Sequence, residues 1–311
     1  MKICQCTKDN KIWCREKQHW TIAGNWKNVS FTDEMSIEVG GTFGTSLVWR
    51  DKTERWHPDC VGATKKQGPS VMCWGMIGHG WKGPFHVWDP ETEEEKKEAE
   101  AEIQRLNFEM EEEADHANRA WKSTPEWVEL RLRELAAARV QRAAEKNGAL
   151  KKTMEQSWRG KKFKVEKLKR GEHIRGVDAW RYVKHVAKPL MWPECHRQLQ
   201  RNPDFVLMED GASPHSAHYT SREREKQGIA KFDWVSNSPD FNPIERIWTL
   251  MKRRIQRRRA LERVTTIAEM KVVLCEEWEK ITIDEINCEI EKLPTIISRC
   301  LAVNGSNNFH A

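Results

Sequence analysis

Between Trp26 and Trp88, apolar and polar residues alternate in short runs that are separated by glycine-rich or charged connections. The runs are rich in β-branched and aromatic residues, and breakers bound them, which is typical of strands. Short connections favour antiparallel neighbours. This region therefore predicts a multi-stranded sheet, with strands at VSFTDEMSIEV, SLVWR, SVMCWGMIGHG and GPFHVW.

The pattern changes abruptly after Asp89-Pro90. Almost half of residues 91–170 are charged, and strand formers are few. The run EWVELRLRELAAARVQRAAEK is rich in strong helix formers, and Val128, Leu132 and Leu135 recur at helical spacing. We therefore expect a charged helical insertion over residues 91–178.

The two ends of this insertion differ in charge. Residues 91–115 are mainly acidic and residues 151–170 mainly basic. This asymmetry favours solvated helices that pair with each other. Contact between the basic end and DNA is the alternative.

Sheet-like sequence returns after the insertion. DAWRYVKHVAKPLMWPECHRQLQ predicts a helix, and DFVLMED predicts a buried strand that ends at carboxylates. Ser213-Pro214 is typical of an N-cap and first helical residue, and Gly228 of a helix stop. IAKFDWV predicts the next strand, and a loop then leads to the helix IERIWTLMKRRIQRRR and an amphipathic helical tail.

Composition limits the class of protein. A chain of 311 residues can bury a sizeable core in one large domain or two smaller ones. Nine cysteines without a Cys-x-x-Cys pair indicate neither a disulfide framework nor a zinc ribbon. No apolar run is long enough for a signal peptide or a membrane span, so we expect a soluble intracellular protein.

Three acidic residues lie where a metal site on a sheet would need them. Asp33 lies inside the first strand, Asp210 ends the DFVLMED strand, and Glu245 falls in the first turn of a later helix. Carboxylates at strand ends and helix starts can converge at one edge of an α/β sheet. We therefore interpret these three residues as a candidate metal site.

Each of these residues also has a structural interpretation. Asn242, Pro243 and Glu245 match the N-cap, first and third positions of a capping box. Asp33 could be a turn residue, and Asp210-Gly211 is a common turn dipeptide.

The three positions together resemble the Tc/mariner superfamily of DDE transposases. VSFTDE, VLMEDGASPHSA and WVSNSPDFNPIERIWTLMKRRI match its three catalytic motifs, and SPDFNPIERIW is the most specific of these pieces. Residues 211–244 supply the 34-residue interval of the branch whose last carboxylate is Glu. HWTIAGNWKNVSFTDE, VMCWGMIGHGWKGPF and the C-terminal helical sequence also match.

The resemblance implies an α/β protein with a ribonuclease H-like mixed sheet flanked by helices. It also implies that Asp33, Asp210 and Glu245 bind two Mg²⁺ or Mn²⁺ ions. With these ions, the protein would hydrolyse DNA phosphodiesters and transfer strands in cut-and-paste transposition. The physics agrees, because two carboxylates about 4 Å apart repel by about 4 kcal/mol at an effective dielectric of 20, so three of them need cations or raised pKa values. His215 lies where the family often has a histidine, so it is either a helper of the site or a structural residue.

The resemblance further implies that the partners are DNA, as transposon ends and target, and it is compatible with a homodimer. It implies no small-molecule cofactor, no membrane and a nuclear location. A basic stripe continues the helix that begins near Glu245, and phosphate contact, nuclear import or a solvated helix face would each explain it. The stripe consists of Lys252, Arg253, Arg254, Arg257, Arg258 and Arg259.

The family pattern fails in two places. Family members usually carry a paired helix-turn-helix module ahead of the first catalytic strand, and only 32 residues precede Asp33. The interval from Asp33 to Asp210 is also longer than usual, which the insertion explains. We therefore interpret residues 1–25 as the remnant of a linker, 26–90 and 179–311 as the two parts of the catalytic domain, and 91–178 as the insertion.

No dedicated reader of DNA sequence is evident, so we expect weak, salt-sensitive DNA binding with little preference among duplexes. Two other classes of function stay open. One is a domesticated or degenerate transposase-derived protein that binds DNA without catalysis, and the other is a helical scaffold built around the insertion.

Overall fold

The computed structural model describes residues 5–39, 68–146, 163–170, 176–235 and 238–305. The chain divides into two compact units. The first combines residues 1–90 with 175–311, and the second consists of residues 91–174. The second unit begins where the sequence predicts the insertion and ends four residues before the predicted boundary at 178.

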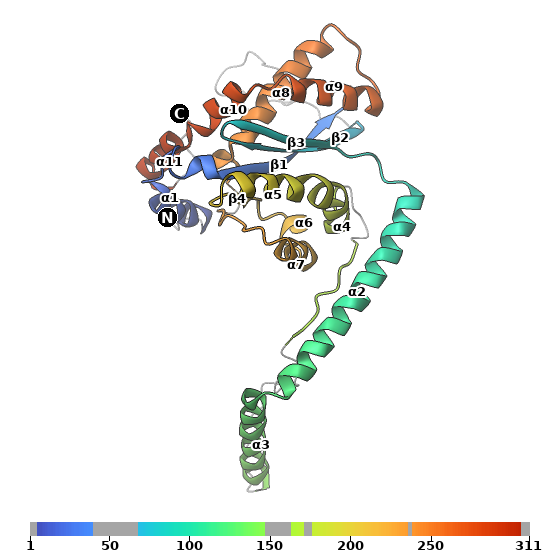
Figure 1. The fold of residues 1–311 in the computed structure, drawn as a ribbon, viewed down its shortest axis with the longest axis vertical. Helices are drawn as coiled ribbons and strands as arrows, with labels where there is room; N and C mark the ends of the chain where they lie inside the picture. Colours follow the sequence, from blue (N-terminus) through green and yellow to red (C-terminus); the bar gives the residue numbers. More distant parts are fainter. Residues whose placement is uncertain (1–4, 40–67, 147–162, 171–175, 236–237, 306–311) are drawn as a thin grey trace, which may run out of the picture. The chain divides into compact units, whose positions relative to one another are not determined.

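A four-stranded mixed sheet forms the centre of the first unit (Figure 1). Its order is β3-β2-β1-β4, with β1 antiparallel to β2, β2 antiparallel to β3, and β1 parallel to β4. The prediction of antiparallel neighbours is therefore confirmed, whereas the predicted strand SLVWR lies outside the described residues. The strands are β1 (Val29–Glu38), β2 (Ser70–Gly78), β3 (Trp81–Val87) and β4 (Val206–Met208).

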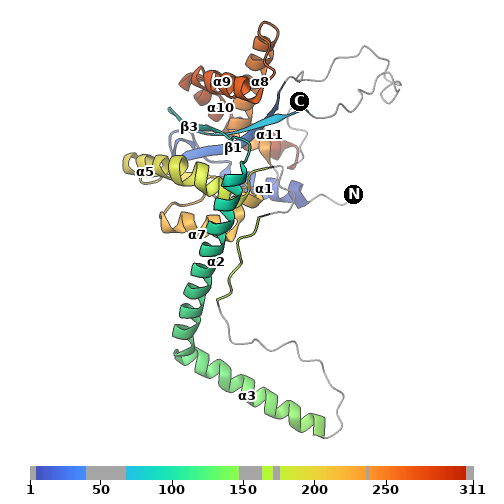
Figure 2. The ribbon, with the colours of Figure 1, turned by 90° about the vertical axis from the view of Figure 1, so that its right-hand side faces the viewer.

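Helices cover both faces of this sheet. In Figures 1 and 2, α8 (Pro243–Arg259), α9 (Ile267–Glu279) and α10 (Ile283–Ile290) lie on one side of the strands, and α5 (Trp192–Arg201) and α7 (His218–Lys226) lie on the other. Such a sheet buries side chains on both faces, which explains why β1 and β2 are buried over much of their length.

The sequence DAWRYVKHVAKPLMWPECHRQLQ forms the expected helix in three parts. These parts are α4 (Ala179–Tyr182), the π-helical segment η3 (Val183–Met191) and α5. Pro189 lies inside η3. Proline lacks an N–H and its ring collides with a carbonyl of the preceding turn, and the wider π turn accommodates both effects.

The predicted strand IAKFDWV is wrong as an extended element. Only Lys231 forms a bridge, parallel to Leu207. Two backbone hydrogen bonds with Leu207 flank this bridge. Aromatic packing holds the rest of the segment, because Phe232 and Trp234 contact Trp13 with ring centroids 6.5 and 5.1 Å apart. Among the described residues, the sheet therefore ends at β4.

The turn after β4 differs from its prediction by one residue. The short helix α6 (Ser213–Ser216) has Ala212 at its N-cap, so Ser213 is the first helical residue and does not cap. Gly228 follows the end of α7 with φ of 66°, a left-handed conformation that favours glycine, so the predicted stop is confirmed.

The remaining helices close the core of the first unit. Capping boxes at Thr266 and Thr282 begin α9 and α10, and α11 (Leu293–Ala302) follows. Helix α1 (Gln5–Lys17) lies within the segment interpreted as a linker remnant, but Trp13 and Cys14 on it are buried in the same core as the sheet. This segment is therefore part of the folded unit. Two 3₁₀ turns, η1 (Trp26–Asn28) and η4 (Pro239–Phe241), precede β1 and α8.

The second unit contains the two predicted helices, α2 (Glu93–Lys122) and α3 (Pro125–Lys146). The described part of its basic end, residues 163–170, is extended and not helical, and it lies beside α2 (Figure 2). Asn118 and Asn107 on α2 each exchange two hydrogen bonds with the backbone, at Phe163 and Leu168, of 2.8 to 3.0 Å.

The charged ends of the insertion pair with each other, as the structural interpretation predicts. Lys167 lies 2.7 Å from Glu111, and Arg170 lies 2.6 Å from Glu91. Side-chain hydrogen bonds and ion pairs thus hold this segment without a helix. In the described part of the chain, no helix is long and apolar enough to cross a membrane.

Candidate active site

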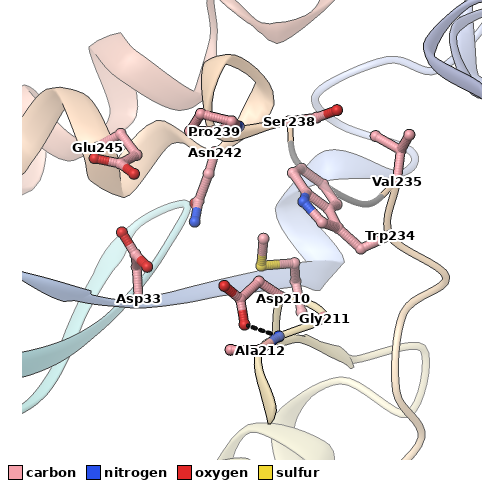
Figure 3. A pocket seen from close by; sticks show the side chains of 11 residues that line it. Asp33, Asp210, Gly211, Ala212, Trp234, Val235, Ser238, Pro239, Asn242 and Glu245 are labelled. Carbon is pink, nitrogen blue, oxygen red and sulfur yellow. Dashed lines mark hydrogen bonds between the residues drawn. The ribbon is translucent and has the colours of Figure 1, made fainter. Parts of the chain in front are cut away.

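Asp33, Asp210 and Glu245 line one cavity of about 560 Å³ in the first unit. They come from three elements: β1, the end of β4 and the first turn of α8 (Figure 3). The sheet register explains the first two. Val29 pairs with Val206 and Phe31 with Met208, so the same register continued by two residues brings Asp33 opposite Asp210.

The position of Asp33 depends on a glycine in the neighbouring strand. Asp33 pairs with Gly75 on β2, and a Cβ at Gly75 would lie 2.7 Å from the ring of Trp248 and 2.9 Å from that of Trp278. The missing side chain leaves room for Trp248 on α8, whose Nε1 donates a hydrogen bond of 3.1 Å to Asp33 Oδ2. Asp33 is thus a strand residue and not a turn residue.

Glu245 enters the cavity because α8 begins at the sheet. Asn242 is the N-cap and Pro243 the first helical residue, as predicted, but the Asn242 side chain makes no capping hydrogen bond. It donates instead to the carbonyl of Thr32, next to Asp33, over 3.2 Å. The capping-box interpretation of Glu245 is therefore wrong, and Figure 3 shows its carboxylate pointing toward that of Asp33.

Asp33 is the most perturbed acid of this cavity. Burial, followed by repulsion from Glu245 and from Glu34, raises the pKa of Asp33 to about 8. The hydrogen bond from Trp248 only partly opposes this shift. Two acidic groups thus face each other without a compensating positive charge.

A buried histidine connects Asp210 to the acid next to Asp33. His215 Nδ1 lies 2.6 Å from Asp210 Oδ1, and His215 Nε2 lies 3.1 Å from Glu34 Oε1. Successive strand residues point to opposite faces, so Glu34 reaches this histidine on the side of the sheet away from Asp33. Sequence reasoning found His215 and missed Glu34, although the alternation of TDE was a usable signal.

The charges of His215, Asp210 and Glu34 compensate one another, unlike those around Asp33. Burial opposes a charged His215, but the carboxylates of Glu34 and Asp210 outweigh it and raise the pKa of His215 to about 10. Although burial opposes ionisation of Asp210 as well, the hydrogen bond and charge of His215 hold the pKa of Asp210 below its usual value. His215 is therefore a cation that fixes an ionised Asp210.

Backbone contacts also orient Asp210. Its Oδ1 accepts a hydrogen bond of 2.9 Å from Ala212 N–H (Figure 3), and Lys231 Nζ donates to its carbonyl oxygen over 3.1 Å. Asp210-Gly211 therefore forms a turn, which agrees with the structural interpretation of this dipeptide. Both residues also line the cavity. Sequence reasoning had no signal for Lys231, because its segment was expected to be a strand.

The donor set fits a hard divalent cation, although the side chains are not gathered around one point. In the described part of the chain, no three His, Cys, Asp or Glu side chains lie close enough together to hold a metal ion. The cavity nevertheless offers carboxylate oxygens, and Asn242 Oδ1 in its wall is buried without a hydrogen-bond partner among the described residues. Oxygen ligands of this kind suit Mg²⁺.

The predicted basic stripe divides into two groups. Arg254 lies 2.5 Å from Glu285, Arg258 pairs with Glu262 and Glu276, and Arg259 donates to a backbone carbonyl of β1. These three arginines serve the fold. The other members, Lys252, Arg253 and Arg257, make no ion pair among the described residues, so DNA contact by them stays a prediction.

The sequence and structure comparisons all match this chain to transposases or to a related endonuclease family. A family model described as DDE superfamily endonuclease matches residues 172–268, which include Asp210 and Glu245. The Tcb1 transposase of Caenorhabditis briggsae is 27% identical over 130 residues, covering 42% of this chain and 44% of the relative. The Tc3 transposase of Caenorhabditis elegans is 23% identical over 298 residues, covering 96% of this chain and 63% of the relative.

Parts of this chain are thus similar in sequence to Tc/mariner transposases. Its fold agrees with that of the Mos1 transposase catalytic domain, with a TM-score of 0.52 at 12% identity and 98% of each chain covered. The ribonuclease H-like class of the sheet is thereby confirmed. The chain spans less than half of the Tcb1 transposase and under two thirds of the Tc3 transposase.

Proposed function

We propose that this chain is the catalytic part of a cut-and-paste DNA transposase, which cleaves and rejoins DNA phosphodiesters with divalent metal ions held by Asp33, Asp210 and Glu245. The observation that carries the proposal is the single cavity lined by these carboxylates, which come from distant parts of the sequence. Its wall lies on a sheet of the same fold as the Mos1 catalytic domain.

The similar proteins support both the metal and the substrate. Mos1 structures are described with Mg and with Mn, and one is a paired-end complex with a left transposon end. We propose two Mg²⁺ or Mn²⁺ ions here. When bound, they would activate a water or a DNA 3′-hydroxyl for in-line attack and stabilise the leaving oxygen.

The protein's own contribution is to position the ligands. Trp248 fixes Asp33 and His215 fixes Asp210, so both carboxylates are restrained before substrate arrives. Both hydrogen bonds of the Asp210 carboxylate are made by Oδ1, so Oδ2 has no hydrogen bond among the described residues and is available for a cation. A homodimer and a nuclear location stay predictions of the family resemblance.

The test is metal-dependent cleavage of a DNA duplex by the purified chain. Cleavage should require Mg²⁺ or Mn²⁺, and Asp210→Asn or Glu245→Gln should reduce it by about a thousandfold or more, because metal catalysis contributes several kcal/mol to the barrier. Asp204→Asn and Glu225→Gln are matched controls, since both residues are exposed and lie outside the cavity.

Binding of Mn²⁺ without DNA, followed by calorimetry, separates metal binding from cleavage. Folded active-site variants that still cleave at the parent rate would remove these residues from the reaction. A chain that binds DNA but neither binds Mn²⁺ nor cleaves would instead support the DNA-binding protein without catalysis.

A further inference from the structure

A second cavity, of about 920 Å³, begins where the carboxylate cavity ends. The two share Pro239 and Glu245 in their walls. The second cavity is a groove formed by η4, α8, α10 and α11, which we call the α8–α11 groove. Its charged lining residues are Arg246, Arg253, Lys292, Arg299, Asp240, Glu245 and Glu289.

Three arginines of this groove are not used by the fold. Arg246 and Arg253 on α8 and Arg299 on α11 are exposed, and none forms an ion pair with another described residue. Their neighbours Arg254 and Arg258 differ, because both are bound to glutamates of α9 or α10. The groove therefore brings together three cations that have no ion pair among the described residues.

The acidic lining residues do not cancel this charge. Glu289 is paired with Lys292 over 2.7 Å, and Glu245 belongs to the proposed metal site. Asp240 is the remaining acid, on η4 at the mouth shared with the first cavity. Three arginines thus share the groove lining with one further acid, Asp240.

The spacing of these arginines suits a phosphate backbone. Arg246 and Arg253 are seven residues apart on α8, which is two helical turns or about 10 Å. That length corresponds to about three nucleotides at the axial rise of one DNA strand. Thr295 on the facing helix adds a hydroxyl group to these guanidinium groups. The hydroxyl of Thr249, between the two arginines, donates to the Glu245 carbonyl over 3.0 Å.

We propose that the α8–α11 groove binds the phosphate backbone of the DNA strand that enters the carboxylate cavity, through Arg246, Arg253 and Arg299. This inference rests on the proposed function for the identity of the strand. The groove contains no aromatic side chain among its lining residues, so it has no platform for stacking bases. Because phosphate contacts carry no sequence information, binding in the groove is independent of sequence. The wall that both cavities share at Glu245 directs the bound strand toward the carboxylates.

The test compares two triple variants that remove the same charge. One is Arg246→Gln/Arg253→Gln/Arg299→Gln, and the control replaces three exposed arginines outside both cavities, Arg15, Arg201 and Arg263, by glutamine. Affinity for a short duplex is measured in EDTA over a range of salt concentrations, so that neither metal nor cleavage enters the result.

The groove variant should bind about thirtyfold more weakly at 0.15 M salt, and its log-log salt slope should fall by about two to three, near 0.9 for each lost phosphate contact. The control should stay within about twofold, because distant charges are screened. Arg246→Gln and Arg299→Gln, tested singly, should each reduce the salt slope by about one. If DNA contacted only a basic stripe on α8, Arg299→Gln on α11 would leave the slope unchanged.

Equal losses in the two triple variants would overturn the inference, because net charge alone would then explain binding. Preferential binding of polyglutamate over DNA would overturn it too, in favour of an acidic protein partner. DNA affinity is measured without metal, so it is independent of cleavage. If Asp210→Asn abolishes cleavage but leaves DNA binding by the groove intact, the inference stands. An inactive parent chain would count against the proposed function alone.

Discussion

Helices α8 and α3 have similar sequences and opposite environments. Both begin with proline, both are rich in arginine, and both repeat apolar residues at helical spacing. On α8 the repeat is buried in the core of the first unit, and Ile255 is 0% exposed. On α3 the repeat faces solvent, and Leu132 is 61% exposed.

Charged residues on the two helices differ in the same way. Arg254 and Arg258 of α8 pair with glutamates of other helices. On α3, Arg131 pairs with Glu134 and Arg133 with Glu129, within the same helix. An amphipathic pattern therefore predicts that a helix forms, but contacts with other elements decide whether its residues stabilise the fold.

The largest expected effect comes from truncating the two apolar repeats. Ile255→Ala should lower the free energy of unfolding by about 2 to 5 kcal/mol, because it removes a fully buried side chain and leaves a cavity. Leu132→Ala should change it by less than about 0.5 kcal/mol, as exposed positions do. Urea denaturation of both variants measures the difference, and similar losses would mean that the α3 repeat is covered in solution.

A second prediction concerns Asp33, a buried acid of the first unit. Helix α3 has no such residue, because its charged residues are largely exposed. The pKa of Asp33 is about 8 in the folded chain, against a usual value near 4 in the unfolded chain. The stability from this raised pKa is fully present below about pH 4 and is lost as pH rises toward 8.

Asp33→Asn removes this dependence. Without divalent metal, the variant should therefore gain stability relative to the parent as pH rises from about 4 to 8. The raised pKa of His215, about 10, also contributes stability that is lost as pH rises above the usual value of about 6.5. This contribution is common to the parent and the variant, because both contain His215. Thermal unfolding across this pH range is the measurement, and parallel curves for the two proteins would contradict a raised pKa at Asp33.

The smallest expected effect concerns the whole insertion. Replacing residues 91–174 with a short Gly/Ser linker should leave the cooperative unfolding of the first unit almost unchanged, because these residues form a compact unit by themselves. Circular dichroism and denaturation of the shortened chain test this. If cooperativity is lost, the insertion is part of the core, and the contrast between α8 and α3 does not extend to their units.

Much of the fold and site could be predicted from local sequence. Strands β1, β2 and β3 follow from alternation and breakers, and α7 ends at the predicted glycine. Asp33, Asp210 and Glu245 could be proposed as a set because strand ends and helix starts carry their own signals and the family motif joined them, and the structure places all three in one cavity. Their catalytic role stays a prediction.

Other features had no local signal. IAKFDWV has the composition of a strand, but it packs through aromatic rings and pairs only at Lys231. The extended form of residues 163–170 depends on Asn118 and Asn107, which are 45 and 61 residues away from the backbone groups that they bind. In both segments, contacts distant in sequence outweigh local propensity.

The sequence by itself predicted most of the strands and helices and singled out the three carboxylates, because helix and strand periodicity and capping are properties of neighbouring residues. Only the tertiary structure decided the environment of each charge. It made Glu34 a partner of His215, and it used Arg254 and Arg258 for the fold while Arg253 lines the groove. The reason is physical: burial and electrostatic pairing depend on distances between elements, which a linear pattern does not contain.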